Sequence, residues 1–419
     1  MILWTDKFHT RRLEGIINTD NHKNNYMLQY IVGLKGLLTI IILILHIIIC
    51  FYPATYYGID GQIAECGYRY NWELFVGRTP LLFFYNGSFA VYIFFIVSGF
   101  LLTKSIYKSQ KVLYDLKKLI LRIEFFCITI FLSILFSYAV IFWGFNHNYE
   151  VGYLIGNGAL YGYLYPKDAG SFLSIFKDLF DVFRGWSIYN VPLWFMSCEI
   201  VGTLYTYCFC IIRKKTKTKA IFALMILVSL VTSIVFRKQY IICFLAGILF
   251  NEFGKINEKK ESRLISNSVF KNVFILFLIF LGILFGGYPI IKSNDRLFYE
   301  CFPNIPYEYY YVMGSICIFY AIMYSYIIQK LLNNKILGKI GEISYYVYLF
   351  HFPVYMSLGM YLFLNLNENL KIQYDIAAFI SGFISILFSL CIALLFNSTL
   401  GQIIKKQTLL RKAIKLDKV

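Results

Sequence analysis

The stretch IVGLKGLLTIIILILHIIICFY, residues 31–52, is apolar along almost its whole length, and Lys35 and His46 are its only basic residues. About 20 apolar residues cross the hydrocarbon core of a bilayer as an α-helix, so this stretch predicts a transmembrane helix. Nine further stretches are long enough, or nearly so, to do the same, although the one at 239–253 is short. They cover residues 85–103, 119–143, 193–212, 219–236, 239–253, 270–291, 309–332, 344–366 and 374–397. We therefore expect an all-α, polytopic membrane protein with about ten transmembrane helices.

The composition of the 419 residues excludes several other classes of protein. Hydrophobic residues make up 59 % of the chain and charged residues only 15 %. A soluble globular protein carries roughly 25 % charged residues. A water-soluble domain, a disulfide-rich secreted scaffold and an intrinsically disordered chain are therefore excluded.

The net charge of +17 would suit a nucleic-acid partner, but the positions of the basic residues argue otherwise. With the N-terminus inside, most of the 40 Lys and Arg residues fall on the cytoplasmic side, as the positive-inside rule requires. We therefore expect both termini in the cytoplasm and no nucleic-acid partner. The runs Arg213-Lys214-Lys215 and Lys405-Lys406 are expected to fix this topology and to contact anionic lipid of the bilayer.

The chain is expected to form one membrane domain without a soluble appendage. The three expected segments are a cytoplasmic N-terminal segment (1–29), a membrane domain (30–400) and a basic cytoplasmic tail (401–419). The first apolar run is typical of a signal anchor rather than of a cleaved signal peptide. The long outer loop 144–192 is expected to be partly helical. Cys66 and Cys301 fall in outer loops, where they could form a disulfide or remain two free thiols.

Few ionisable residues lie within the predicted helices. A charge or an imidazole in hydrocarbon is costly and usually faces a partner or a wet cavity, so a functional role is the first interpretation. The alternative is snorkelling to the interface for those near helix ends, and a structural hydrogen bond for the deeper ones. The residues concerned are Lys35, His46, Arg122, Glu124, Glu199 and His351.

Helix geometry predicts the depths of these residues. Lys35 and His46 are separated by about 16 Å along one helix and share a face. Glu199 lies about six residues below the outer edge of its helix, so we expect it to meet His46 at one level. His351 is expected between the levels of Lys35 and His46. Pro353 removes one helix hydrogen bond and should free a backbone carbonyl there.

The result is a polarised candidate site. Cations at the cytoplasmic mouth (Lys35, Lys104, Lys118 and Arg122) suit a phosphate-bearing ligand from the cytosol. A histidine beside a carboxylate suits a general base. Together these features indicate a group taken from a phosphorylated cytosolic donor and delivered to a nucleophile reached from outside. We expect no metal site.

Four segments resemble motifs of a known family, acyltransferase family 3. The segment Val32-Gly33-Leu34-Lys35-Gly36 followed by His46 is similar to the family's Asp-Gly-Leu-Arg-Gly segment with its Arg-x10-His spacing. The other three, FFIVSGFL, LWFMSCE and ISYYVYLFH, begin at Phe94, Leu193 and Ile343. They are similar to Phe-Phe-x-x-Ser-Gly-Phe-Leu, Leu-Trp-x-x-x-x-Glu and Ile-Ser-Tyr-x-x-Tyr-Leu-x-His.

The sequence departs from the family pattern at three positions. Val32 replaces an Asp, Lys35 replaces an Arg, and Phe125 replaces the Pro of an Arg-Ile-x-Pro segment. The change at Lys35 keeps the charge but loses the bidentate fork of Arg.

The resemblance implies an integral-membrane O-acyltransferase, with residues 30–400 as its acyltransferase domain. The donor would be cytosolic acyl-CoA, expected to be acetyl-CoA, with no permanently bound cofactor. The acceptor would be a hydroxyl of a cell-envelope carbohydrate or glycolipid, and the location a bacterial cytoplasmic membrane. An appended esterase-like domain known in some members is not expected, so a second transfer step would need a separate extracytoplasmic transferase.

The resemblance and the depths together assign residue roles. The catalytic residues would be His46 as general base, Glu199 orienting His46, and His351. The donor would be bound by Lys35, Arg122 and Ser98. The residues expected to line the substrate channel are Trp194, Tyr345 and Tyr348.

Two other functions remain as alternatives. One is a transporter or flippase for an anionic or glycosylated substrate, and the other is a non-catalytic membrane assembly subunit. Transporters often carry paired, Gly/Pro-broken helices in two repeated halves, and this sequence shows no such repeat. The enzyme is therefore the favoured hypothesis.

Overall fold

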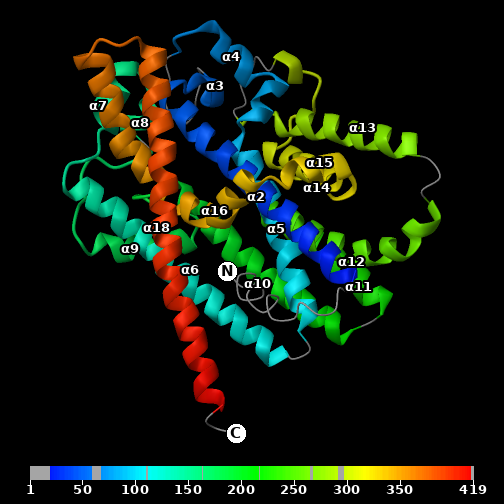
Figure 1. Cartoon of the computed structure of the whole chain (residues 1–419). Coiled ribbons are helices and arrows are strands. Elements are labelled where there is room, and N and C mark those ends of the chain that lie inside the picture. The colour runs from blue at the N-terminus through cyan, green and yellow to red at the C-terminus, as the bar shows by residue number, and fades with distance from the viewer. Residues whose placement is uncertain are drawn as a thin grey trace.

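The computed structural model describes residues 19–58, 68–109, 112–162, 164–216, 218–264, 268–290 and 297–416. Every long regular element among them is a helix, which confirms the all-α prediction (Figure 1). Cys66 lies outside the described residues, while Cys301 is exposed.

Eight of the ten predicted stretches fall on one long helix each, whereas the other two, 309–332 and 344–366, are each divided between a long helix and shorter ones. The long helices are α2 (Thr19–Phe51), α5 (Gly87–Lys108), α6 (Val112–Phe142), α10 (Trp194–Lys215), α11 (Lys219–Val235), α12 (Tyr240–Leu264), α13 (Ser268–Gly286), α14 (Tyr307–Tyr324), α16 (Lys335–Val354) and α18 (Tyr374–Leu416).

Short helices connect them. They are α3 (Ala54–Tyr57), α4 (Asn71–Gly77), η2 (Pro80–Phe84), α7 (Asn148–Ile155), α8 (Gly158–Gly162), α9 (Ser174–Phe183), η3 (Val191–Leu193), η4 (Leu297–Tyr299), α15 (Tyr326–Leu332), η5 (Tyr355–Gly359), α17 (Met360–Leu364) and η6 (Asn365–Asn369). The stretch 309–332 is divided between α14 and α15, and 344–366 runs from α16 through η5 and α17 into η6.

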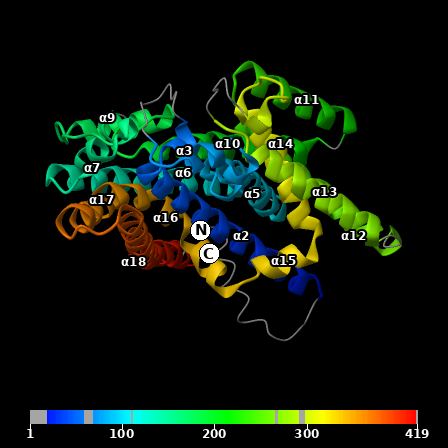
Figure 2. The ribbon, with the colours of Figure 1, turned by 90° about the horizontal axis from the view of Figure 1, so that it is seen from above.

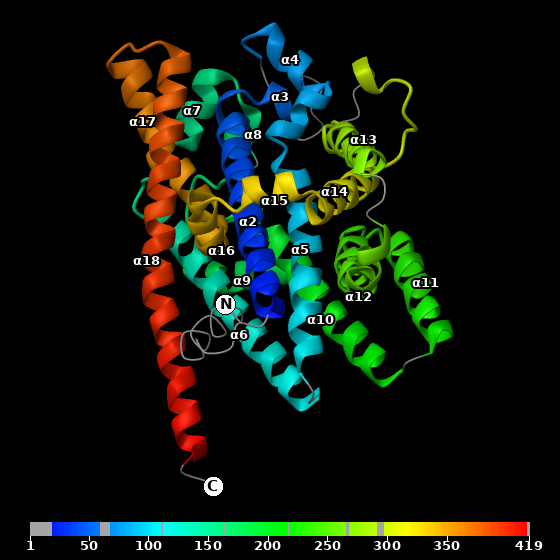
Figure 3. The ribbon, with the colours of Figure 1, turned by 45° about the vertical axis from the view of Figure 1, so that its right-hand side comes forward.

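Length and composition identify fewer membrane spans than predicted. Among the described residues, seven helices are long and apolar enough to cross a bilayer. An eighth is counted if α14 and α15, which meet at 93°, form one broken span. The difference from ten arises because α11 and the apolar part of α12, Tyr240–Gly254, are short. The chain is therefore a polytopic membrane protein. The start of α2 and the end of α18 lie at the same end of the bundle (Figure 3).

Two glycines of α2 let neighbouring helices lie close to it: Gly36 faces Leu337 of α16, and Gly33 faces Leu332, the last residue of α15. Figure 2 shows α2 and α16 side by side. A Cβ added at Gly36 would lie 2.0 Å from the carbonyl oxygen of Leu337, and one at Gly33 would lie 1.8 Å from that of Leu332. A side chain at either position would push the helices apart. Gly36 therefore permits the close contact between α2 and the start of α16, and Gly33 permits that between α2 and the end of α15.

One lysine of the basic run at the end of α10 forms a buried ion pair. Lys214 Nζ is 2.8 Å from Asp115 Oδ2 and donates to the Ser109 carbonyl at 2.9 Å. The Asp115 side chain is fully buried, so this ion pair ties α10 to the start of α6. The side chains of Lys405 and Lys406 lie outside the described part of the chain.

Candidate active site

His46 and His351 form a pair near the ends of α2 and α16. His46 Nδ1 lies 3.3 Å from His351 Nε2, and the two rings meet edge-on with centroids 4.7 Å apart. His46 Nδ1 is also 2.9 Å from the carbonyl oxygen of Ile42. His351 Nδ1 lies 2.8 Å from the carbonyl oxygen of Tyr348. We call these two histidines the histidine pair.

The carbonyl contacts assign the protons of the pair. A backbone carbonyl only accepts, so in each ring the Nδ1 atom carries the hydrogen. In the neutral rings both Nε2 atoms are then acceptors. His351 Nε2 faces the Nδ1–H of His46, while His46 Nε2 keeps a lone pair that can accept a proton. His46 therefore has the form of a general base held by His351.

The predicted contact between Glu199 and His46 is wrong. Glu199 Oε1 accepts hydrogen bonds from Arg122 Nη2 at 2.7 Å and from Ser98 Oγ at 2.5 Å. Its other oxygen, Oε2, is buried and has no hydrogen-bond partner in the part of the chain that the structure describes. The carboxylate thus belongs with the cation Arg122 and not with the histidine pair.

The error arises from where α10 begins. The depth prediction placed residue 193 at the outer edge of the membrane. In the structure, Pro192 and Leu193 of η3 are buried, and the Tyr348 hydroxyl donates to the Pro192 carbonyl. The turn before α10 therefore already lies inside the bundle beside Tyr348. Glu199 lies about 10 Å further along α10, toward the other end of the bundle.

Lys35 lies near the Arg122–Glu199 pair. The charges of Arg122 and Glu199, together with that of Glu342, act on the Lys35 ammonium. The guanidinium of Arg122 also packs on the ring of Phe126 at 4.8 Å. We call Lys35, Ser98, Arg122 and Glu199 the inner level, which holds two cations against one buried carboxylate.

Two helices give the same distance between the inner level and the histidine pair. On α2, Lys35 and His46 are separated by about 16 Å along the axis. On α6, Arg122 and Ser133 have the same sequence separation, and Ser133 donates to the carbonyl of Leu349 at 2.7 Å, two residues before His351. The cations and the histidines therefore lie about 16 Å apart.

The predicted channel residues are placed around these two levels. The Tyr345 hydroxyl is 2.5 Å from Thr129 Oγ1, and its ring packs on Phe125 and Phe126. The Tyr348 ring lies 4.8 Å from that of Phe195. Trp194 is the first residue of α10 and is partly buried.

Three other predicted charges lie elsewhere. Lys104 Nζ contacts the Met27 sulfur at 3.6 Å, Lys118 lies over the ring of Tyr114, and Glu124 is exposed.

Ser133 and Asn190 are two further residues near the histidine pair that the sequence did not predict. Both donate to the carbonyl of Leu349, which is the carbonyl that Pro353 leaves without its helical partner. The freed carbonyl was predictable from the proline, whereas its donors come from distant segments and carry no motif.

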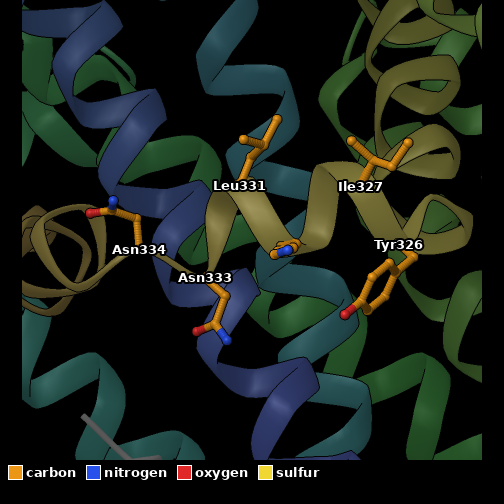
Figure 4. A pocket seen from close by; sticks show the side chains of 6 residues that line it. Tyr326, Ile327, Leu331, Asn333 and Asn334 are labelled. Carbon is orange, nitrogen blue, oxygen red and sulfur yellow. The ribbon is translucent and has the colours of Figure 1, made fainter.

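A surface hollow of about 490 Å³ lies beside α15 and is separate from this site (Figure 4). It is lined by Tyr326, Ile327, Lys330, Leu331, Asn333 and Asn334. Within the described residues, no group of three or more His, Cys, Asp or Glu side chains is placed to hold a metal ion.

Comparison with models of protein families shows the family to which the chain belongs. A family model described as an acyltransferase domain, that of acyltransferase family 3, matches residues 28–398. The match covers nearly the whole chain and includes every residue of the inner level and the histidine pair. No curated protein and no solved structure gives a significant match. The chain belongs to acyltransferase family 3 and is an acyltransferase with several membrane helices.

Proposed function

We propose that this protein transfers an acyl group, expected to be acetyl, from cytosolic acyl-CoA to a hydroxyl of a cell-envelope carbohydrate or glycolipid. The observation that carries the proposal is the separation of two cations from a neutral histidine pair by about 16 Å. A donor whose phosphates lie far from its reactive thioester fits such a site. The location proposed is the cytoplasmic membrane of a bacterium, with both termini in the cytoplasm.

The inner level is suited to the phosphates of CoA. Lys35 supplies a point charge, and Arg122 supplies a planar donor group. Glu199 accepts hydrogen bonds from Arg122 and from Ser98. The carboxylate therefore holds the guanidinium in place. The long, uncharged pantetheine arm of CoA would then extend past the aromatic side chains of Tyr345 and Tyr348 toward the histidine pair. No permanently bound cofactor is needed for this chemistry.

The histidine pair is suited to general base catalysis. His46 Nε2 takes the proton of the acceptor hydroxyl as its oxygen attacks the thioester carbonyl carbon. The tetrahedral intermediate then collapses, the carbon–sulfur bond breaks, and the CoA thiolate leaves. The proton on His46 Nε2 passes to the thiolate, giving free CoA and the acyl ester. The Ile42 carbonyl and His351 Nε2 both accept from His46 Nδ1–H. The carbonyl fixes the tautomer of His46, and His351 adds a second acceptor that stabilises the imidazolium.

In this proposal His351, and not Glu199, is the residue that orients the base His46. Glu199 is bonded to Arg122 and Ser98, so its proposed effect is on donor binding. His351 is the group that faces His46 Nδ1. If the acyl group must travel further on the outer side, a separate extracytoplasmic transferase would carry out that step.

The test uses the full-length protein reconstituted in vesicles and supplied with radiolabelled acetyl-CoA. Wild type should release CoA and labelled acyl product, and His46→Gln should lose most of the rate while still binding donor. His147→Gln is the matched control, because His147 lies at the start of α7 outside the site. A correctly inserted His46→Gln protein with the wild-type rate would refute the proposed base. Accumulation of a substrate without any acyl chemistry would favour the transporter instead.

The acceptor is sought in cells. O-acetyl groups on surface glycans are compared by mass spectrometry between wild type, a deletion strain, and the deletion strain complemented with His46→Gln. The proposal expects acyl groups on a carbohydrate to be lost in both mutant strains. Unchanged surface glycans and glycolipids would refute the carbohydrate acceptor.

A further inference from the structure

Pro353 leaves a gap in the hydrogen bonding of α16. A proline has no N–H, so the carbonyl four residues earlier, that of Leu349, lacks its usual helical donor. Leu349 is fully buried, so bulk water cannot replace that donor. A buried carbonyl inside a membrane bundle is costly unless another group donates to it.

Two side chains from other parts of the fold fill this gap. Ser133 Oγ on α6 donates to the Leu349 carbonyl at 2.7 Å. Asn190 Nδ2, from the loop before η3, donates to the same carbonyl at 2.9 Å and also lies 2.9 Å from Ser133 Oγ. Both side chains are fully buried. The backbone of α16 is thus held at this point by two outside donors.

The loop that presents Asn190 is itself held in place. The carboxylate of Asp178 on α9 accepts from Ser187 Oγ at 2.8 Å and from the backbone N–H of Ile188 at 2.6 Å. Ser187 Oγ in turn accepts from the backbone N–H of Asn190 at 3.1 Å. Desolvation by burial raises the pKa of the Asp178 carboxyl above its usual range. A continuous series of hydrogen bonds therefore joins α9 to Asn190.

A second, independent contact joins the same two regions. The Tyr348 hydroxyl of α16 donates to the carbonyl of Pro192, two residues after Asn190. The carbonyls of Val347 and Tyr348 are the ones that hold His351 Nδ1. The outer loop thus bonds directly to the turn of α16 that orients His351.

We propose that Asn190 is a positioning residue for His351, acting through the Leu349 carbonyl that Pro353 leaves free. The inference rests on the proposed function, in which His351 holds the base His46. Asn190 fixes the turn that carries the acceptors of His351 Nδ1, and so fixes the direction of His351 Nε2. Without Asn190 the ring of His351 loses its alignment with His46, while the donor site at the inner level is untouched.

A double-mutant cycle with Pro353 tests the proposal in the full-length, reconstituted protein. Asn190→Ala should lower kcat roughly tenfold, the order expected when a buried carbonyl loses a hydrogen bond, and leave the KM for acetyl-CoA unchanged. Pro353→Ala restores an N–H that can donate to the Leu349 carbonyl. In that background, Asn190→Ala should therefore lower kcat by less than about threefold.

Asn148→Ala is the matched control. Asn148 is also fully buried, in the loop 144–192, and its Nδ2 donates to the carbonyls of Leu160 and Tyr165. These hydrogen bonds stay within that loop, so the variant should lower the melting temperature and leave kcat unchanged. If Asn190→Ala does not fold, Ser133→Ala removes the other donor to the same carbonyl, and the same pattern is expected in the same cycle.

The outcomes separate this inference from the proposed function. A folded Asn190→Ala protein with wild-type kcat, or an equal loss in both backgrounds, would overturn the positioning role. A loss that appears only as a raised KM would do the same. If His46→Gln were fully active, the proposed function itself would fail.

Discussion

Replacing Lys35 by Gln tests the donor site at the inner level. Lys35 is partly buried, and the charges of Arg122 and Glu199 act on its ammonium. A charged hydrogen bond from this ammonium to a donor phosphate contributes about 1.5–3 kcal/mol. Because each 1.4 kcal/mol is about tenfold in affinity, Lys35→Gln should raise the KM for acetyl-CoA by roughly 10- to 150-fold. The kcat at saturating donor should change little, because the lost contact is made equally in the ground state and the transition state.

Donor titrations measure this effect in vesicles in which the orientation of the protein has been checked. Lys35→Arg should stay active, because it keeps the positive charge and adds a planar fork. Lys219→Gln removes an exposed lysine at the start of α11 and should leave the KM unchanged. His46→Gln gives the opposite pattern, with kcat lost and donor binding kept.

A topological role for Lys35 predicts a different result. Snorkelling to the interface would make Lys35→Gln change the amount or orientation of inserted protein and leave its kinetics normal. Correctly inserted Lys35→Gln protein with the wild-type KM would therefore refute phosphate binding by this residue.

Three further variants test other parts of the structure. Glu199→Gln should raise the KM for acetyl-CoA up to about tenfold with little change in kcat, because the hydrogen-bond partner of Glu199 is the Arg122 guanidinium. A loss of kcat at constant KM would instead support the earlier prediction that Glu199 orients the base His46. Gly36→Ala should destabilise the fold by about 1–3 kcal/mol, measured by thermal unfolding, because its Cβ meets a backbone carbonyl. Gly338→Ala is its control, since no described atom lies within 4 Å of that Cβ. Lys214→Ala should cost about 3–5 kcal/mol by leaving a buried carboxylate unpaired, whereas Lys215→Ala, at an exposed position, should have little effect on the melting temperature.

The helices could be predicted because long apolar runs have few stable alternatives in a bilayer. The freed carbonyl at Leu349 could also be predicted, because it follows from the covalent structure of Pro353 alone. His351 was expected between the levels of Lys35 and His46, whereas the structure brings its ring into contact with that of His46.

The partners of Glu199 and of the Leu349 carbonyl could not be predicted in the same way. The depth of Glu199 depends on a loop that enters the bundle before α10, and buried contacts of Pro192 hold that loop. Ser133 and Asn190 reach Leu349 across 216 and 159 residues of sequence. Such contacts depend on how the helices pack, which an apolar pattern does not specify.

Because the inner level and the histidine pair are separated, the phosphate charges of the proposed donor do not have to move across the membrane's electric field during the reaction. Moving one elementary charge across a potential of 100 mV costs about 2.3 kcal/mol. In the proposed reaction the phosphates stay beside Lys35 and Arg122, and only the neutral arm and acyl group reach His46. The proton passes from hydroxyl to thiolate within the site. Acyl transfer by this route is electroneutral, so its rate should not change when the membrane is depolarised.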